Sequence, residues 1–163
     1  MTAKRWSKMN FTTVSIEQPD VLGQVSPSVV RLGVPTRLFG DAAYCLLPQI
    51  EMKPDSGNVI FATIRNGSHS LGIVKDGLLV VEIDAEGLQL PFCDSTDQFC
   101  MISKRLMETL MTTSVPWSEA ITTIWRQLEE EGVLGQLGSD NYWYEIFSEI
   151  LIGDIHEDDY KLE

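Results

Sequence analysis

The stretch NVIFATIRNGSHSLGIVKDGLLVVEIDAEGLQLPF, Asn58 to Phe92, restricts the fold of this chain more than any other. It contains Asn66-Gly67 and Asp76-Gly77, dipeptides that close tight β-hairpins because they tolerate positive φ angles. Ala85-Glu86-Gly87 supplies a third turn, and short runs rich in valine and isoleucine lie between the turns. The pattern predicts an antiparallel meander whose most apolar strand is central and covered on both faces. The expected strands are residues 59–65, 69–74, 78–84 (the central one) and 88–91.

The residues before Asn58 predict further strands that are less regular. FTTVSIE, from Phe11, alternates apolar and polar residues, and residues 29–32 and 36–39 have the composition of short strands. CLLPQIEM, from Cys45, is expected to be a strand that Pro48 bends or restricts to a sheet edge, because proline cannot donate to a central ladder.

After Phe92 the apolar residues change from a period of 2 to the 3.6-residue period of a helix. Ser95 followed by Gln98 has the form of a capping box, which predicts a helix that runs to about Thr112. Its apolar stripe is Phe99, Ile102, Leu106 and Leu110. Three methionines and a cysteine widen the apolar sector of this helix, so it is expected to have two neighbours. These residues are Cys100, Met101, Met107 and Met111.

Two more helices are expected towards the C-terminus. The second follows Pro116 and ends at Gly132, and the third starts near Ser139 and ends at Gly153, since glycine commonly stands just past a helix end. The stripe of the second comprises Trp117, Ala120, Ile121, Ile124, Trp125 and Leu128, and that of the third Trp143, Ile146, Phe147, Ile150 and Leu151.

Strands first and helices last predict an α+β fold: an antiparallel β meander in the N-terminal two thirds, packed by two to three C-terminal helices. A chain of 163 residues suits a single domain, 1–163. Its expected parts are a basic flexible N-terminus, a β-sheet region, a helical region and an acidic tail. They span residues 1–10, 11–92, 95–153 and 154–163.

The negative charge is concentrated at one end of the chain. The net charge is −12, and residues 129–163 hold 11 acidic residues and one basic residue, Lys161. Such a field repels nucleic acid and anionic lipid, so no direct nucleic-acid binding and no membrane association are expected. The kind of partner that this charge favours is a basic protein, for instance a nuclease or a toxin.

The three cysteines, Cys45, Cys93 and Cys100, include no CxxC pair, and an odd number does not form a disulfide framework. They are expected to be free thiols in a reducing compartment. The N-terminal sequence lacks the apolar run of a secretory signal, and no window is apolar enough to span a membrane. A cytoplasmic location is therefore expected.

The end of the chain, NYWYEIFSEILIGDIHEDDYKLE, holds the candidate partner-binding residues. Trp143 belongs to a core-facing stripe, but Tyr142 and Tyr144 lie about 100° to either side of it on a helix, so at least one of them is expected at the surface. An aromatic rim beside Glu145 and Glu149 would suit a docking patch, because tyrosine and tryptophan anchor many interfaces. The alternative is that the tyrosines lie flat on their own protein.

The last ten residues allow two interpretations. Acidic ends are commonly solvated and mobile, and they aid solubility. The functional alternative is electrostatic attraction of a basic partner, which weakens as salt rises. The candidate residues are Asp154, His156, Glu157, Asp158 and Asp159. The acids of LEEEG, residues 128–132, stand at a helix C-terminus, where the helix dipole disfavours them and no local compensation is evident.

Enzymatic chemistry has weak support in the sequence. Cys93 precedes a predicted helix, whose N-terminus lowers a thiol pKa, but the neighbouring Asp94 and Asp97 raise it. Glu82 and Asp84 share a strand face, which would suit acid–base work only if that face lined a pocket. The histidines, His69 and His156, fit no metal-binding pattern, and no cofactor motif is present.

The leading hypothesis is therefore a non-catalytic protein-binding module, of the inhibitor or immunity-protein type, whose acidic C-terminal region docks on a basic protein surface. No catalytic residue, metal or cofactor is assigned. The second hypothesis is a homo-oligomeric module, such as a homodimer, that binds a small ligand or is structural, through the methionine-rich helix and the sheet. The third is an enzyme with a thiol or carboxylate centre.

Overall fold

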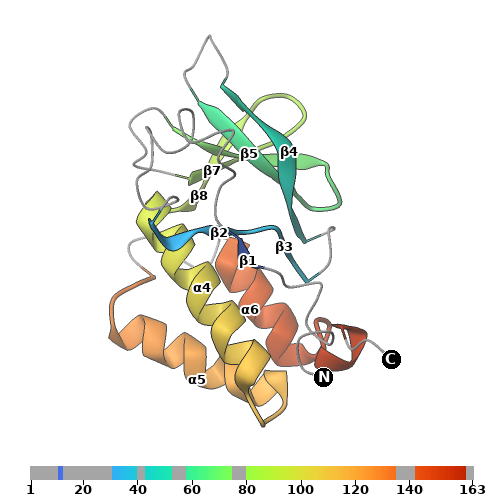
Figure 1. Ribbon diagram of the computed structural model, residues 1–163, viewed down its shortest axis with the longest axis vertical. Coiled ribbons are helices and arrows are strands. Elements are labelled where there is room, and N and C mark those ends of the chain that lie inside the picture. Colours follow the sequence, from blue (N-terminus) through green and yellow to red (C-terminus); the bar gives the residue numbers. More distant parts are fainter. Residues whose placement is uncertain are drawn as a thin grey trace.

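The computed structural model describes residues 11–12, 31–39, 43–52, 58–74, 80–134 and 142–160 (Figure 1). The fold is α+β, as predicted, with strands first and helices last. The strands are β1 (Phe11–Thr12), β2 (Val34–Pro35), β3 (Arg37–Leu38), β4 (Tyr44–Met52), β5 (Val59–Ile64), β6 (His69–Ile73), β7 (Val80–Ile83) and β8 (Gln89–Cys93). The helices are α4 (Thr96–Thr112), α5 (Trp117–Glu130), α6 (Tyr142–Ile152) and the short 3-10 helix η2 (Glu157–Tyr160).

The main sheet is a six-stranded meander in the order β3-β4-β5-β6-β7-β8, with every neighbouring pair antiparallel. β1 and β2 form a separate two-stranded sheet. The expected strand at residues 29–32 is wrong at Arg31 and Leu32, which are helical, because short apolar runs do not distinguish the two structures. Pro48 lies where the register of β4 against β5 shifts, between Leu46 and Glu51, which agrees with the predicted bend.

The prediction that strand 78–84 is central is wrong. β7 is the fifth of six strands, and β5 and β6 lie at the centre. β7 is apolar because the second face of the sheet has a small cluster of its own. Val81 pairs with Gly72, and a Cβ on Gly72 would lie 2.9 Å from Ile60 Cδ1 and 3.2 Å from Ile83 Cδ1. Glycine at this position leaves room over the strand for the ends of both isoleucine side chains.

The turns of the meander that the structure describes lie where the sequence predicts them, except that one is shifted by one residue. Between β5 and β6, positive φ angles occur at Arg65, Asn66 and Gly67, and Gly67 N–H donates to Ile64 O at 3.1 Å. The tight turn is therefore centred on Arg65-Asn66, one residue before the predicted position. At the third predicted turn, Asp84 Oδ1 accepts the N–H groups of Glu86 and Leu88. The predicted turn at Asp76-Gly77 lies outside the described residues.

The helices begin and end close to the predicted positions. Ser95 Oγ accepts the Gln98 N–H at 3.0 Å, while Gln98 Oε1 accepts the N–H of Asp94, one residue before the position that a capping box uses. The start expected near Ser139 is not seen, since α6 begins at Tyr142 and residues 135–141 lie outside the described part. The predicted stripes are buried, with two exceptions: Trp125 is half-buried, and Leu151 is 45% exposed.

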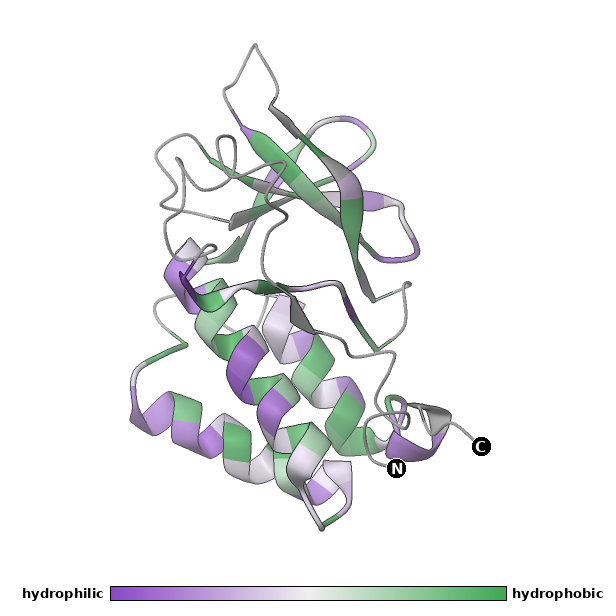
Figure 2. Ribbon diagram, in the orientation of Figure 1, coloured by the Kyte–Doolittle hydropathy of each residue, from purple (hydrophilic) through white to green (hydrophobic). Residues whose placement is uncertain are grey.

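The three helices lie together on one side of the main sheet (Figure 1). Their contact with it is made by the first turns of α4 and α6, where Phe99 and Trp143 meet Phe92 of β8 at ring distances of 5.9 and 5.8 Å. Figure 2 shows hydrophobic residues along β5 and hydrophobic and hydrophilic residues interspersed along the helices. None of the helices in the described ranges is both long and apolar enough to cross a membrane.

Candidate functional site

An open pocket of about 370 Å³ lies where the first turns of α6 approach the β5–β6 turn and the end of β3. It is lined by residues from four separate parts of the chain, which are Phe39, Ala43, Arg65, Asn66, Tyr142, Glu145, Glu149 and Ile155. Three of them, Tyr142, Glu145 and Glu149, belong to the predicted partner-binding set. They share one face of α6, because their spacing is i, i+3 and i+7.

The backbone around this pocket is strained. In the described residues, three non-glycine positions have positive φ angles: Phe39 at 51°, Arg65 at 53° and Asn66 at 60°. All three line the pocket. A positive φ is uncommon for a non-glycine residue and a clear outlier for a bulky one such as Phe39. Strain of this kind gathers at functional sites, where surrounding contacts hold it.

Arg65 forms one wall of the pocket. Its guanidinium carbon lies 4.7 Å from the centre of the Tyr142 ring, and Nη1 lies 3.0 Å from Oε2 of Glu145. The Tyr142 hydroxyl donates a 3.0 Å hydrogen bond to the Ala43 carbonyl, which fixes the ring against the sheet. The chain itself therefore places a guanidinium against an aromatic face and a carboxylate.

Glu149 lies one turn further along α6, and its carboxylate has a different environment from that of Glu145. Among the described residues, no hydrogen bond or ion pair reaches its carboxylate. Burial, then the charges of Glu145 and Asp154, raise the pKa of Glu149, and Arg65 opposes this only in part. A half-buried carboxylate held among like charges gains from a cation placed beside it.

Glu149 is only half-buried and solvent screens its charged neighbours, so Glu149→Gln is expected to stabilise the protein at pH 7 by no more than about 0.5 kcal/mol. A raised pKa in the folded state means that the folded state binds the proton more tightly than the unfolded state does. The free-energy cost of keeping Glu149 ionised in the folded protein therefore grows as pH rises above the unfolded value of 4.5. The gain should therefore vanish at about pH 3.5, where the carboxyl is protonated in both states. Urea unfolding at the two pH values measures it. An equal or larger gain in stability at pH 3.5 would contradict a raised pKa for Glu149.

The three adjacent aromatics of α6 face three directions. Trp143 is 0% exposed and lies among Phe92, Phe99 and Phe147, so it holds α6 in the core and cannot touch a partner directly. Tyr144 is half-buried against Trp125 of α5, at a ring distance of 5.3 Å. Tyr142 lines the pocket but is itself buried, at 8% exposed, so neither tyrosine is fully exposed and Tyr144 is the one at the rim.

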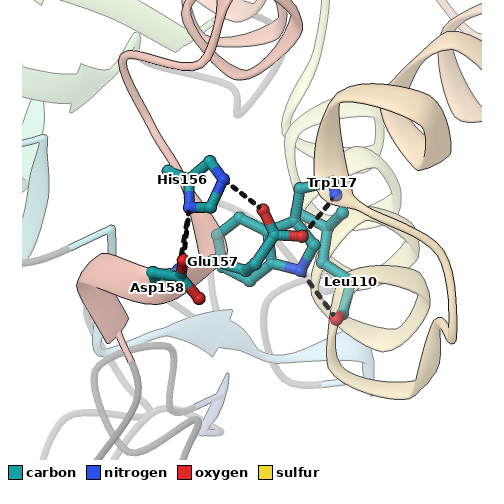
Figure 3. A network of polar contacts seen from close by, with 5 residues as sticks. All are labelled: Leu110, Trp117, His156, Glu157 and Asp158. Atoms are coloured by element: carbon teal, nitrogen blue, oxygen red, sulfur yellow. Dashed lines mark hydrogen bonds and ion pairs between the residues drawn. The ribbon is translucent and has the colours of Figure 1, made fainter.

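The C-terminal segment is not wholly a free tail. Ile155 is buried, lines the pocket and donates its N–H to the Glu149 carbonyl at 3.0 Å. Glu157, with a side chain 13% exposed, accepts the Trp117 N–H at 2.8 Å through Oε2, and so caps the start of α5 (Figure 3). Pro116 provides no side-chain cap there.

The other acidic-tail residues lie around this cap. His156 Nε2 is 3.0 Å from Glu157 Oε1, and its Nδ1 accepts the Asp158 N–H (Figure 3). Asp154 and Asp158 are exposed, and the side chain of Asp159 lies outside the described part of the chain. The exposed members of this set remain accessible, whereas Glu157 is used within the fold.

The cap gives a second prediction. Glu157→Ala is expected to lower the free energy of unfolding by about 1 kcal/mol, because it removes an acceptor and a negative charge from a helix N-terminus. Glu157→Gln keeps an acceptor and should lose less than half of that. The exposed neighbour Asp158→Ala, the matched control, should change stability by less than about 0.5 kcal/mol. Equal losses in Glu157→Ala and Asp158→Ala, measured by urea unfolding, would refute the cap.

The acids at the end of α5 gain a partner that the sequence did not reveal. Arg105 of α4 forms two contacts with Glu131, at 2.8 and 3.1 Å, and they lower the pKa of Glu131 and raise that of Arg105. The expectation that these acids have no local compensation is therefore wrong for Glu131.

Of the groups considered for catalysis, those whose side chains the structure describes do not line the pocket. Cys93 is fully buried, and burial raises the pKa of its thiol well above the usual range. Burial also raises the pKa of Cys100 to about 12. Asp84 accepts turn hydrogen bonds, and the side chain of Glu82 lies outside the described part. His69 is half-buried at the start of β6. Over the described residues, no group of three potential metal ligands occurs.

Five pocket residues escaped the sequence analysis: Phe39, Ala43, Arg65, Asn66 and Ile155. The Asn-Gly turn beside Arg65 was visible in the sequence, but nothing local indicates that this turn reaches α6, which follows almost 80 residues later.

Comparisons of the chain with models of protein families, with curated proteins and with solved structures found no match.

Proposed function

We propose that this protein is a non-catalytic binding module, of the inhibitor or immunity type, that docks on a basic protein surface. The docking face is the acidic pocket face, which we define as the pocket together with Asp154. One observation carries the proposal: the half-buried carboxylate of Glu149 faces a pocket without a partner from the described residues, and the charges of Glu145 and Asp154 each act on it more strongly than that of Arg65. The protein would act by covering the surface of its partner and by charge complementarity, and it would catalyse no reaction.

The charge of the acidic pocket face supports this assignment. Arg65 is balanced by its ion pair with Glu145, so Glu149 and Asp154 contribute the remaining negative charge. A rigid site with excess negative charge speeds encounter with a positive surface and loses that effect as salt rises. The site rests on a helix anchored by the buried Trp143, so its geometry is largely formed before binding.

We place the interaction in the cytoplasm as part of the same proposal. The support is that all three cysteines are free, two of them buried. Free thiols of this kind are usual in reducing compartments.

The test is a titration with a lysine- and arginine-rich peptide of about 12 residues, followed by fluorescence anisotropy at low and physiological salt. Wild-type protein should bind, and binding should weaken as salt rises. The triple variant E145Q/E149Q/D154N should lose on the order of tenfold in affinity.

The matched control neutralises three exposed acids of α5 instead, as E119Q/E129Q/E130Q. Both triple variants have the same net charge, so a difference between them isolates the acidic pocket face from charge in general. The proposal fails if the two variants weaken binding equally, or if neither does.

A second candidate function, self-association, has one observation in its favour. Leu88 and Leu90 are 59% and 49% exposed, and Leu90 lies on β8, the end strand of the main sheet. Exposed apolar edge strands pair readily with another copy. Light scattering would show a mass of twice 18.3 kDa if this holds, and a monomer at all accessible concentrations would exclude it.

A further inference from the structure

We infer that the pocket receives an arginine side chain of the partner, with the Glu149 carboxylate as its acceptor. The inference rests on the proposed function and deepens it, because it names the chemical group that is recognised. The ligand class is a guanidinium carried on a polypeptide.

Arg65 shows how this surface holds a guanidinium. Its own guanidinium lies over the Tyr142 ring and pairs with Glu145, and both of those residues come from α6. Cation–π contact together with a carboxylate is a favourable setting for arginine. Glu149 stands one helical turn beyond Glu145 on the same face, and it repeats the carboxylate with no second guanidinium beside it among the described residues.

The pocket has room and lining for such a group. Its volume is about 370 Å³, and its walls combine the apolar side chains of Phe39, Ala43 and Ile155 with the polar group of Asn66. Phe39 and Ile155 are buried and therefore fixed in place. An arginine stem can lie along apolar walls while its head reaches a carboxylate.

The burial of Glu149 favours guanidinium over ammonium. Burial is the largest cause of its raised pKa, so a cation must give up water to reach it. Guanidinium is the more weakly hydrated of the two cations, and its planar fork matches a carboxylate with two hydrogen bonds. Because Glu145 balances Arg65, an incoming arginine does not meet an uncompensated positive charge there.

The experiment uses three small probes on the full chain: N-acetyl-arginine methylamide and the corresponding lysine and citrulline compounds. Citrulline has nearly the shape of arginine but no charge. Amide NMR shifts should report saturable binding of the arginine probe at Ala43, Asn66 and Ile155. Lysine should bind about threefold more weakly, and citrulline about tenfold or more.

Two single variants then locate the acceptor. Glu149→Gln should weaken the arginine probe by at least about fivefold, whereas Glu130→Gln, at an exposed position of α5, should leave it unchanged within about twofold. Unchanged spectra away from the pocket establish that both variants are folded.

The outcomes separate this inference from the proposed function. Equal binding of citrulline, equal binding of lysine, or no effect of Glu149→Gln would each overturn the arginine assignment. If basic peptides still distinguish the two triple variants in that case, docking on a basic surface stands without an arginine pocket. If the arginine probe binds but basic peptides do not, the protein-docking function fails and so does the partner-borne arginine.

Discussion

Replacing Phe99 by alanine is expected to lower the free energy of unfolding by about 3–5 kcal/mol, the range measured for large aromatic truncations in protein cores. Phe99 is completely buried at the start of α4. Its ring lies 5.6 to 5.9 Å from the rings of Tyr44, Phe61, Phe92 and Trp143. Phe99 therefore connects three strands to two helices. Because its neighbours are held by different elements, they cannot move in to fill the cavity that alanine would leave.

Chemical denaturation measures this loss, and Met101 provides the control. Met101 lies on the same helix but is 44% exposed, so Met101→Ala should cost less than about 1 kcal/mol. A loss of that small size in Phe99→Ala would show that the first turn of α4 does not connect the helices to the sheet. The fold described above would then be wrong where it supports the pocket.

Reversing the charge of Glu149 is expected to have the largest effect on binding. Glu149→Lys should weaken a basic peptide on the order of 100-fold, because it removes the proposed acceptor and places an ammonium beside Arg65. Loss of a half-buried acceptor and like-charge repulsion add in this variant. The loss should appear as faster dissociation, from the lost acceptor, and as slower association, from the weaker negative field.

Glu130→Lys is the matched control for this variant. It makes the same change in net charge at an exposed position near the end of α5, where a positive charge suits the helix dipole. It should reduce affinity by less than about threefold through the overall field. Equal losses in the two variants, determined from association and dissociation rates, would mean that Glu149 has no special role.

The local elements of this fold were predictable because their signals are local. Turn dipeptides with runs rich in valine and isoleucine between them identified β5, β6, β7 and β8, and the 3.6-residue stripes identified α4, α5 and α6. The central position given to β7 failed for a physical reason. An apolar strand indicates burial, but burial does not require a central place in the sheet: Val81 is 3% exposed on the fifth strand of six, and Ile83 lies close to Gly72 of the neighbouring strand.

The long-range contacts could not be predicted, because sequence patterns do not reveal which distant residues meet. The ion pair of Arg65 with Glu145 and the cap of Glu157 on Trp117 join residues 80 and 40 positions apart. Consequently the acidic tail was interpreted from composition alone, although Ile155 and Glu157 attach it to the fold. Deleting residues 154–163 would therefore confuse lost binding with lost stability.

Part of the candidate site was nevertheless present in the sequence. Tyr142, Glu145 and Glu149 are spaced to share one helix face, and all three line the pocket. The helical stripe already placed Trp143 in the core, but it could not choose between Tyr142 and Tyr144. Only packing distinguishes the tyrosine that lines the pocket from the one that lies against Trp125.

The most direct test of the central claim is quantitative capture of partners from the protein's own cells. Wild-type protein, the variant E145Q/E149Q/D154N and the equally charged variant E119Q/E129Q/E130Q would serve as baits in parallel. The account predicts a basic protein that the wild type and the α5 variant retain and the pocket variant loses. Equal retention by both variants, or a retained partner that is not basic, would contradict it.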